Sequence, residues 1–277
     1  MYSLRNVPPN RPEARRDSHP AAGLRVISWN LLRLVGAGVE DVVRLIGRHH
    51  PDILLMQEAT ADIAALPGLA GGHLYREPMD RRVYGLAVWS REPIPRPEIL
   101  KLPVSKMPGR VPPRLAQLVH VRGITLVNVH LSHGQFLNRR QLFRIVQALK
   151  GPAAIVGDYN AVGPIRMRGF RDIGPREPTH MADNIVAFRL DRCMARGLHC
   201  AAPQVLARGP SDHHPIILDL AVAHTDEHAF ATERRNIAGW VRALSQQPNT
   251  IRVPQVLSEI RRLRQDRRRA AGREHSA

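Results

Sequence analysis

Cysteine and long apolar runs are scarce in this sequence. Its 277 residues include two cysteines, Cys193 and Cys200, which are too few for a disulfide scaffold and match no CxxC or Cys/His metal spacing. No run of about 18 apolar residues is present, so a transmembrane helix is not expected, and the first residues lack the apolar core of a secretory signal peptide. These absences predict a cytoplasmic protein with reduced thiols.

Acidic residues are scarce relative to basic ones. The chain has 41 Lys and Arg against 24 Asp and Glu, a formal net charge of +17. An excess of this size is typical of proteins that bind a phosphate-rich partner, such as nucleic acid or an anionic lipid surface. Nearly all the cations are arginine, so compositional drift explains the excess equally well. The charge is not confined to the ends of the chain, because residues 25–223 alone carry +10.

One stretch of the chain contains the apolar pattern of a folded core. The 43% apolar content is ample for a single core at this length. Residues 1–23 are rich in Pro, Arg and Asn without apolar periodicity, and they predict a flexible segment. Residues 224–277 contain two helical patterns and the run Arg267–Arg269, which predict a basic helical extension. We therefore expect one domain at residues 24–223 with a further segment at each end.

Several predicted strands of the core end at a polar residue. The strand-like segments are 24–30, 52–56, 84–89, 115–121, 123–130, 153–156, 185–194 and 216–222, with helical patterns at 39–49 and 134–149. Asn30 ends the first segment, Glu58 follows the second, and His130 ends the fifth. Polar side chains that recur at strand ends favour a functional site there.

The segment Gly157-Asp158-Tyr159-Asn160 follows a short buried strand. Because Asp and Asn readily bond their own backbone, this motif fits a simple turn as well as a site. Asp212 and His213 stand in the equivalent position before the last predicted strand. Two such strand ends in one domain favour chemistry over coincidental turns.

The polar residues collected in this way are of the types that phosphate-ester hydrolysis requires. Carboxylate and amide oxygens bind a hard divalent cation, which suits Mg²⁺ or Mn²⁺ better than Zn²⁺. Carboxylates and imidazoles move the protons of the water and the leaving group. The candidate residues are Asn30, Glu58, His130, Asp158, Asn160, Asp191, Asp212 and His213.

Six short motifs contain these residues. They are Ser28-Trp29-Asn30, Met56-Gln57-Glu58, Asn128-Val129-His130, Gly157-Asp158-Tyr159-Asn160, Leu190-Asp191-Arg192 and Ser211-Asp212-His213-His214-Pro215. In this order, from about Val26 to Leu220, the chain resembles the endonuclease/exonuclease/phosphatase superfamily of metal-dependent phosphoesterases. Trp-Asn or Gln-Glu alone is a weak signal, whereas Ser-Asp-His-x-Pro is a strong one.

The resemblance implies a fold and a metal site. The implied fold class is α+β, with two packed mixed β-sheets flanked by helices in a four-layer α/β/β/α sandwich. Asn30, Glu58 and Asp212 would surround a Mg²⁺ or Mn²⁺ ion.

The resemblance also implies catalytic roles. Asp158 and Asn160 would orient the attacking water and a phosphoryl oxygen. His213, paired with Asp191, would be the imidazole at the scissile phosphate. His130 matches the histidine that the deoxyribonuclease and sphingomyelinase branches use near the leaving group, so a role like that of abasic-site endonucleases is less favoured.

The substrate is open at this point, because one such site serves DNA, RNA, phospholipids and inositol phosphates within the superfamily. Basic charge favours a phosphodiester substrate, nucleic acid first. A phospholipid or another phosphate ester is the alternative, and a non-catalytic nucleic-acid-binding module is the hypothesis from another class. The last would require the loss of a catalytic position, and none is missing.

Overall fold

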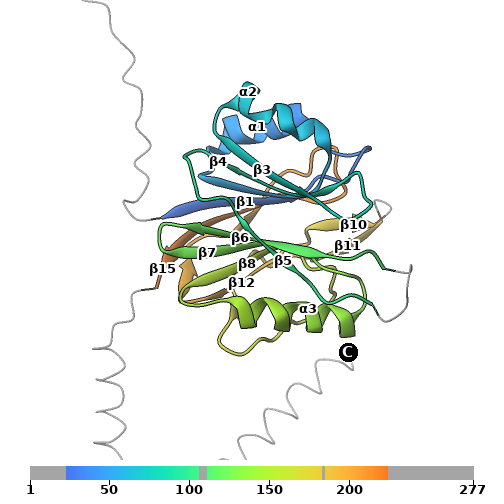
Figure 1. The fold of residues 1–277 in the computed structure, drawn as a ribbon, viewed down its shortest axis with the longest axis vertical. Helices are drawn as coiled ribbons and strands as arrows, with labels where there is room; N and C mark the ends of the chain where they lie inside the picture. The colour runs from blue at the N-terminus through green and yellow to red at the C-terminus, as the bar shows by residue number, and fades with distance from the viewer. Residues whose placement is uncertain (1–22, 106–110, 183–184, 224–277) are drawn as a thin grey trace, which may run out of the picture. The chain divides into compact units, whose positions relative to one another are not determined.

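The computed structural model describes residues 23–105, 111–182 and 185–223. Within them, two mixed β-sheets pack face to face, and helices cover both outer faces (Figure 1). The predicted α+β fold with two packed mixed sheets is confirmed. The predicted flexible segment, except for residue 23, and the predicted helical extension at 224–277 lie outside the described residues.

The first sheet has seven strands among the described residues. In spatial order they are β13 (Leu198–Cys200), β15 (Ile216–Val222), β1 (Leu24–Asn30), β2 (Ile53–Ala59), β4 (Gly85–Ser90) and β3 (His73–Pro78), with β14 (Gln204–Val205) also paired to β15. Strands β1 and β2 are parallel, and the other pairs are antiparallel. The carboxyl ends of β1 and β2 therefore meet at one edge of this sheet.

The second sheet has six strands in the described part of the chain. Their order is β5 (Glu98–Lys101), β6 (Leu115–Val121), β7 (Ile124–His130), β8 (Ala153–Asp158), β12 (Asp191–Arg196) and β9 (Arg171–Asp172). The parallel pair β7 and β8 is joined by helix α3 (Gln135–Ala148). A separate hairpin pairs β10 (His180–Ala182) with β11 (Val186–Phe188).

Alternation along the strands creates the layers. In β1, Val26 faces the core between the two sheets, while Ile27 packs toward the helices. The helices on that outer face are α1 (Val39–His49), the short 3₁₀ helix η1 (Ala61–Ala65) and α2 (Leu66–Ala70). Helix α3 covers the second sheet through the buried side chains of Leu142 and Ile145 (Figure 1).

The predicted strand 185–194 is wrong in one respect, because the structure divides it. Strand β11 ends at Phe188 and β12 begins at Asp191. Between them, the hydroxyl oxygen of Thr179 accepts hydrogen bonds from the backbone N–H groups of Leu190 and Asp191. These donors are bound by a side chain instead of a neighbouring strand, so the ladder is interrupted just before Asp191.

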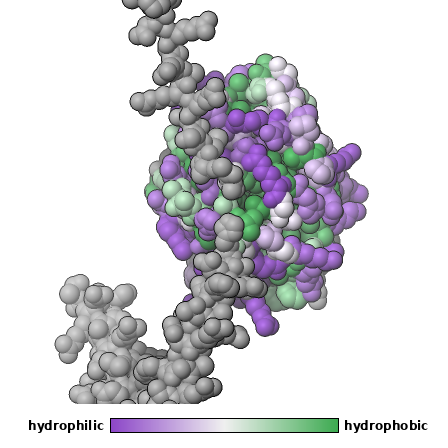
Figure 2. Space-filling model, turned by 90° about the vertical axis from the view of Figure 1, so that its left-hand side faces the viewer, coloured by the Kyte–Doolittle hydropathy of each residue, from purple (hydrophilic) through white to green (hydrophobic). Residues whose placement is uncertain are grey.

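The segment that follows β4 is dense in proline. Its described residues contain one short strand, β5, which lies at the edge of the second sheet and pairs on one side with β6. An edge position is where flanking prolines are tolerated. No helix of the described residues is long and apolar enough to cross a membrane. On the face shown in Figure 2, hydrophilic residues are interspersed with small apolar areas.

Candidate functional site

The ends of four central strands bring the candidate residues together. Asn30 ends β1, His130 ends β7, and Asp158 ends β8. Asp191 begins β12 directly opposite Asp158 in the antiparallel pairing. Because β1 belongs to one sheet and the other three strands to the second, the site lies where the two sheets meet, and Asn30 bonds Asp158 across it.

Asp158 is the centre of this cluster and is 1% exposed. The Asn30 side-chain amide donates to Asp158 Oδ2 over 3.1 Å, and the Asn160 backbone N–H donates to Oδ1 over 2.8 Å. His130 Nε2 lies 3.5 Å from Oδ2. Burial raises the pKa of Asp158 and the neighbouring Asp191 charge adds to this, while His213 and the hydrogen bonds lower it only in part.

The glycine before Asp158 is required by packing. Gly157 has a φ of 137°, and a Cβ at this position would lie 2.2 Å from the carbonyl oxygen of Val129 on the neighbouring strand. Any larger residue would push β8 away from β7. In the Gly-Asp-x-Asn motif, the glycine therefore permits the close approach of β8 to β7, and the asparagine holds Asp158 in place.

His213 forms the contact that the sequence motifs imply. Its Nδ1 lies 2.8 Å from Asp191 Oδ2, and its Nε2 lies 3.9 Å from Asp158 Oδ2. Burial by itself lowers the pKa of His213, but the charges of Asp191 and Asp158 outweigh it and raise the pKa to about 10. The imidazole is therefore charged at neutral pH.

The segment that carries His213 is held in place by hydrogen bonds between side chains and the backbone. The His213 N–H donates to Ser211 Oγ over 3.0 Å, and the Ser211 hydroxyl donates to the Asn30 carbonyl over 2.7 Å. Trp29 also donates its indole N–H to the His213 carbonyl, over 3.0 Å. The serine of the Ser-Asp-His motif thus ties this segment to the end of β1.

His130 differs from His213 although both contact the same carboxylate. It is 3% exposed, and burial, followed by the charge of Arg114, lowers its pKa well below the usual histidine value. Its Nδ1 has no hydrogen-bond partner among the described residues. The site therefore holds one neutral and one charged imidazole.

Glu58 lies at a β-bulge and not beyond the end of its strand. The register between β2 and β4 shifts between Met56 and Ala59, and Glu58 has a φ of 55°. A bulge of this kind re-aims a side chain near an active site. Glu58 Oε1 lies 3.9 Å from His130 Nε2, while Oε2 accepts a 2.8 Å bond from Arg33 Nη1.

Comparison with known proteins identifies the family of this site. The sequence model of the Endonuclease/Exonuclease/phosphatase family matches residues 27–213. The chain belongs to this family. Family members are hydrolases that act on phosphate esters and typically depend on a divalent metal, so the protein is a phosphoesterase.

Similar proteins agree with this assignment at the level of the fold. A UPF0294 protein of Yersinia pseudotuberculosis is 27% identical over 223 residues, which cover 71% of this chain and 83% of the relative. A solved endonuclease/exonuclease/phosphatase family protein of Bacteroides thetaiotaomicron is 20% identical, with a TM-score of 0.62 and coverage of 72% and 98%. The mannosyl-6-phosphatase of the same organism is also 20% identical, with a TM-score of 0.60 and coverage of 72% and 99%.

The donor set fits the divalent metal of this family. Glu58 and Asp212 offer carboxylate oxygens, and Asn30 offers an amide oxygen that also accepts the Leu32 N–H over 3.1 Å. Asp212 Oδ1 is buried and has no hydrogen-bond partner among the described residues. A buried carboxylate oxygen in this state is costly unless a cation or donor satisfies it.

Sequence reasoning missed His180, which the fold places beside Asp212. His180 Nε2 lies 3.3 Å from Asp212 Oδ2, and its ring centroid lies 4.5 Å from that of His213. Burial raises the pKa of Asp212, but the His180 contact and the His213 charge lower it overall. His180 follows the irregular segment 163–179, where no periodic pattern indicated a strand, so only the tertiary contact reveals it.

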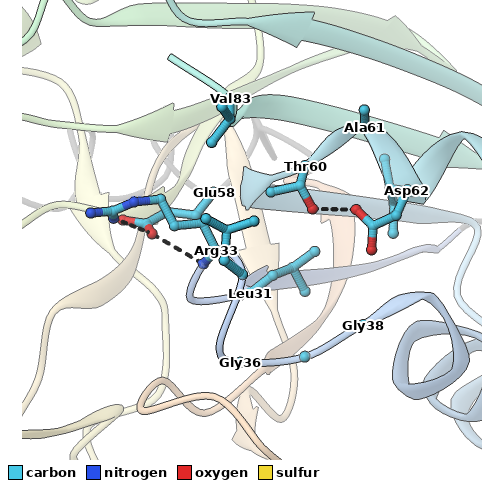
Figure 3. Close-up of a pocket in the computed structure, with 12 residues that line it drawn as sticks. Leu31, Arg33, Gly36, Gly38, Glu58, Thr60, Ala61, Asp62 and Val83 are labelled. Atoms are coloured by element: carbon cyan, nitrogen blue, oxygen red, sulfur yellow. Dashed lines mark hydrogen bonds and ion pairs between the residues drawn. The ribbon is translucent and has the colours of Figure 1, made fainter.

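Arg33 was also missed, and it borders a pocket. The Arg33 side chain is 45% exposed, and its guanidinium pairs with Glu58 and stands 4.7 Å from the ring centroid of Tyr84. The pocket has a volume of about 420 Å³ and lies between the loop 31–38 and the start of η1, from Thr60 to Ile63 (Figure 3). Of the candidate site residues, Glu58 lines this pocket, so the pocket adjoins the site at that residue.

Proposed function

We propose that this phosphoesterase is a Mg²⁺-dependent nuclease that hydrolyses phosphodiester bonds by attack of water. The observation that supports the proposal best is the contact network that joins His213, Asp158, His130 and Glu58. In it, the side chains proposed to handle protons contact the carboxylate proposed to bind the metal. Asn30 and Asn160 join it through Asp158, and Asp191 joins it through His213.

Asn30, Glu58 and Asp212 are the proposed metal-binding residues. All three offer hard oxygen donors, which favours Mg²⁺, with Mn²⁺ as the substitute. When bound, the cation would supply charge stabilisation for the phosphoryl oxygens. His180 would hold the Asp212 carboxylate in the orientation needed for this contact.

Asp158, Asn160 and the two histidines are the proposed catalytic residues. Asp158 would accept the proton of the attacking water, a role that its raised pKa supports because a more basic carboxylate is a better acceptor. Asn160, whose amide bonds both Asp158 and the Leu131 carbonyl, would orient that water. The charged His213 would face the phosphoryl oxygens, and Asp191 would fix its orientation. His130 would lie near the leaving group.

Nucleic acid is the favoured substrate because of the +17 net charge. The similar mannosyl-6-phosphatase raises a small phosphate monoester as a second candidate. A phospholipid and a non-catalytic nucleic-acid-binding role are the remaining alternatives.

A substrate panel tests the proposal. The protein would be assayed with Mg²⁺, Mn²⁺ or EDTA against plasmid DNA, single-stranded DNA, RNA, phospholipid vesicles, inositol phosphates and mannose 6-phosphate. We expect cleavage of nucleic acid that EDTA abolishes. Turnover of a monoester or lipid with none of nucleic acid would replace the nuclease assignment, and binding of nucleic acid without turnover of any substrate would favour the binding module.

A further inference from the structure

The pocket beside Glu58 has two polar ends separated by apolar walls. Arg33 and Glu58 form one end, and Thr60, which bonds Asp62, forms the other (Figure 3). The walls between them are largely apolar: Leu31, Leu34, Ala37, Ile63 and Val83. Its volume of about 420 Å³ is within the range of small-molecule sites, which is roughly 300–1,000 Å³.

The loop that forms one wall is held in an unfavourable conformation. Leu32 and Leu34 have φ values of 53° and 65°, in the left-handed region that leucine rarely adopts. The loop can turn this tightly because Gly36 has no side chain, since a Cβ there would lie 2.1 Å from the Leu31 carbonyl oxygen. Leu34 is consequently 79% exposed at the pocket. Backbone strain that presents an apolar side chain to solvent beside a catalytic site indicates a binding function.

We propose that this pocket receives one nucleobase of the nucleic-acid substrate, next to the scissile phosphate. The inference rests on the nuclease function proposed above. Arg33 would contact a phosphate oxygen, since its side chain is partly exposed and its guanidinium is already oriented by Glu58 and Tyr84. Leu34 and Val83 would contact the faces of the base.

The far end of the pocket gives this site a base preference. Thr60 donates its hydroxyl hydrogen to Asp62 Oδ1, which leaves the carboxylate as an acceptor for a hydrogen-bond donor on the ligand. Cytosine offers an exocyclic amino group at C4, whereas thymine and uracil carry an acceptor oxygen there. Asp62 therefore favours cytosine over thymine at this position. An acyl chain offers no hydrogen-bond donor to this carboxylate.

Cleavage of matched oligonucleotides tests the preference. The full-length protein and its Asp62→Asn variant would be assayed with single-stranded oligo(dC) and oligo(dT) at saturating Mg²⁺. We expect the wild type to favour oligo(dC). Asp62→Asn should lower the kcat/KM ratio of oligo(dC) to oligo(dT) by about tenfold, because an amide donates to the thymine oxygen. Glu98→Gln is the matched control, since it removes one carboxylate from the edge strand β5 and should leave the ratio unchanged.

Equilibrium binding separates this inference from the nuclease assignment. Titration of the metal-free protein with dCMP and dTMP should show tighter binding of dCMP, and Asp62→Asn should remove the difference. Val83→Ser should weaken the binding of both nucleotides roughly threefold to tenfold without changing the ratio of their affinities. The reason is that Val83 would pack against the face of the base and would not hydrogen-bond its edge. If the protein prefers dCMP in this way but cleaves no nucleic acid, the assignment of the pocket to a nucleobase is supported and the nuclease assignment is overturned.

Equal binding of dCMP and dTMP by the wild type would overturn the pocket assignment, even if the protein cleaves nucleic acid. An oligo(dC) to oligo(dT) ratio that Asp62→Asn does not change would do the same. Hydrolysis of phospholipid vesicles together with equal binding of the two nucleotides would identify the occupant as an acyl chain instead.

Discussion

The site has a buried side and an open side, and they differ in almost every physical property. On the buried side, Asp158 and Asp191 are at most 1% exposed, and each carboxylate has a direct hydrogen-bond partner. Asp158 accepts the Asn160 backbone N–H, and Asp191 bonds His213 Nδ1. On the open side, Arg33 is 45% exposed and the adjoining loop contains strained leucines. Burial strengthens electrostatic interactions and shifts pKa values, whereas exposure permits exchange of ligands. We therefore expect protons to be handled on the buried side, and metal and substrate to enter from the open side.

The largest effect should follow from breaking the buried pair of His213 and Asp191. His213→Ala should lower kcat by roughly 10²- to 10⁴-fold, the usual contribution of a proton-handling group. Asp191→Asn should lower kcat by a large part of the same factor. The double variant should be little slower than His213→Ala, because an orienting partner has no effect once its histidine is gone. Steady-state kinetics at saturating Mg²⁺, with circular dichroism to confirm folding, would measure this, and multiplicative losses would contradict the pairing.

Glu58 lies between the buried and the open side, and its replacement should change the metal requirement of the reaction. Glu58→Gln keeps the shape of the side chain but removes one negative charge from the proposed metal site. The Mg²⁺ concentration for half-maximal activity should rise, by roughly tenfold or more. Metal titration of activity and direct calorimetric titration of Mg²⁺ would both report the change. An unaltered metal requirement would remove Glu58 from the metal site.

His180 should affect the metal less than Glu58 does, because it would act through Asp212. His180→Ala should weaken Mg²⁺ binding by about tenfold, the lower end of the range for residues that support a metal ligand. His180→Gln, which retains a donor, should restore part of the affinity. If both variants bind Mg²⁺ like the wild type while Asp212→Asn does not, the positioning role is wrong although the metal site stands.

The smallest effect concerns an ion pair that supports the buried side. Burial alone would raise the pKa of Asp172, but the hydrogen bond and charge of Arg189 lower it overall. A lowered pKa means that this stability is complete above the unfolded-state pKa of about 4 and is lost as pH falls through the lower folded-state value. Asp172→Asn should therefore cost on the order of 1 kcal/mol at pH 7 and progressively less in acid. Urea unfolding at pH 7 and pH 3 would measure this, and an equal loss at both values would contradict it.

Local patterns were sufficient for most of the central strands. The predicted strands 115–121 and 123–130 form β6 and β7, an antiparallel pair that turns at Arg122 and Gly123, whose φ values of 47° and 74° suit a tight turn. Helix α1 spans Val39–His49, the same residues as its apolar period. Short strands at sheet edges, such as β9 and β14, were not predicted because two residues carry no periodic signal.

The sequence by itself determined which residue types stand at the strand ends, because periodicity and turn chemistry are local properties of the chain. It thereby indicated Asn30, Asp158 and His213 as candidates. Only the tertiary structure decided that His180 contacts Asp212 and that Arg33 pairs with Glu58. The physical reason is that these contacts depend on how two sheets pack and on a bulge that turns one side chain. The opposite pKa shifts of His130 and His213 likewise arise from burial and neighbouring charges that no local pattern contains.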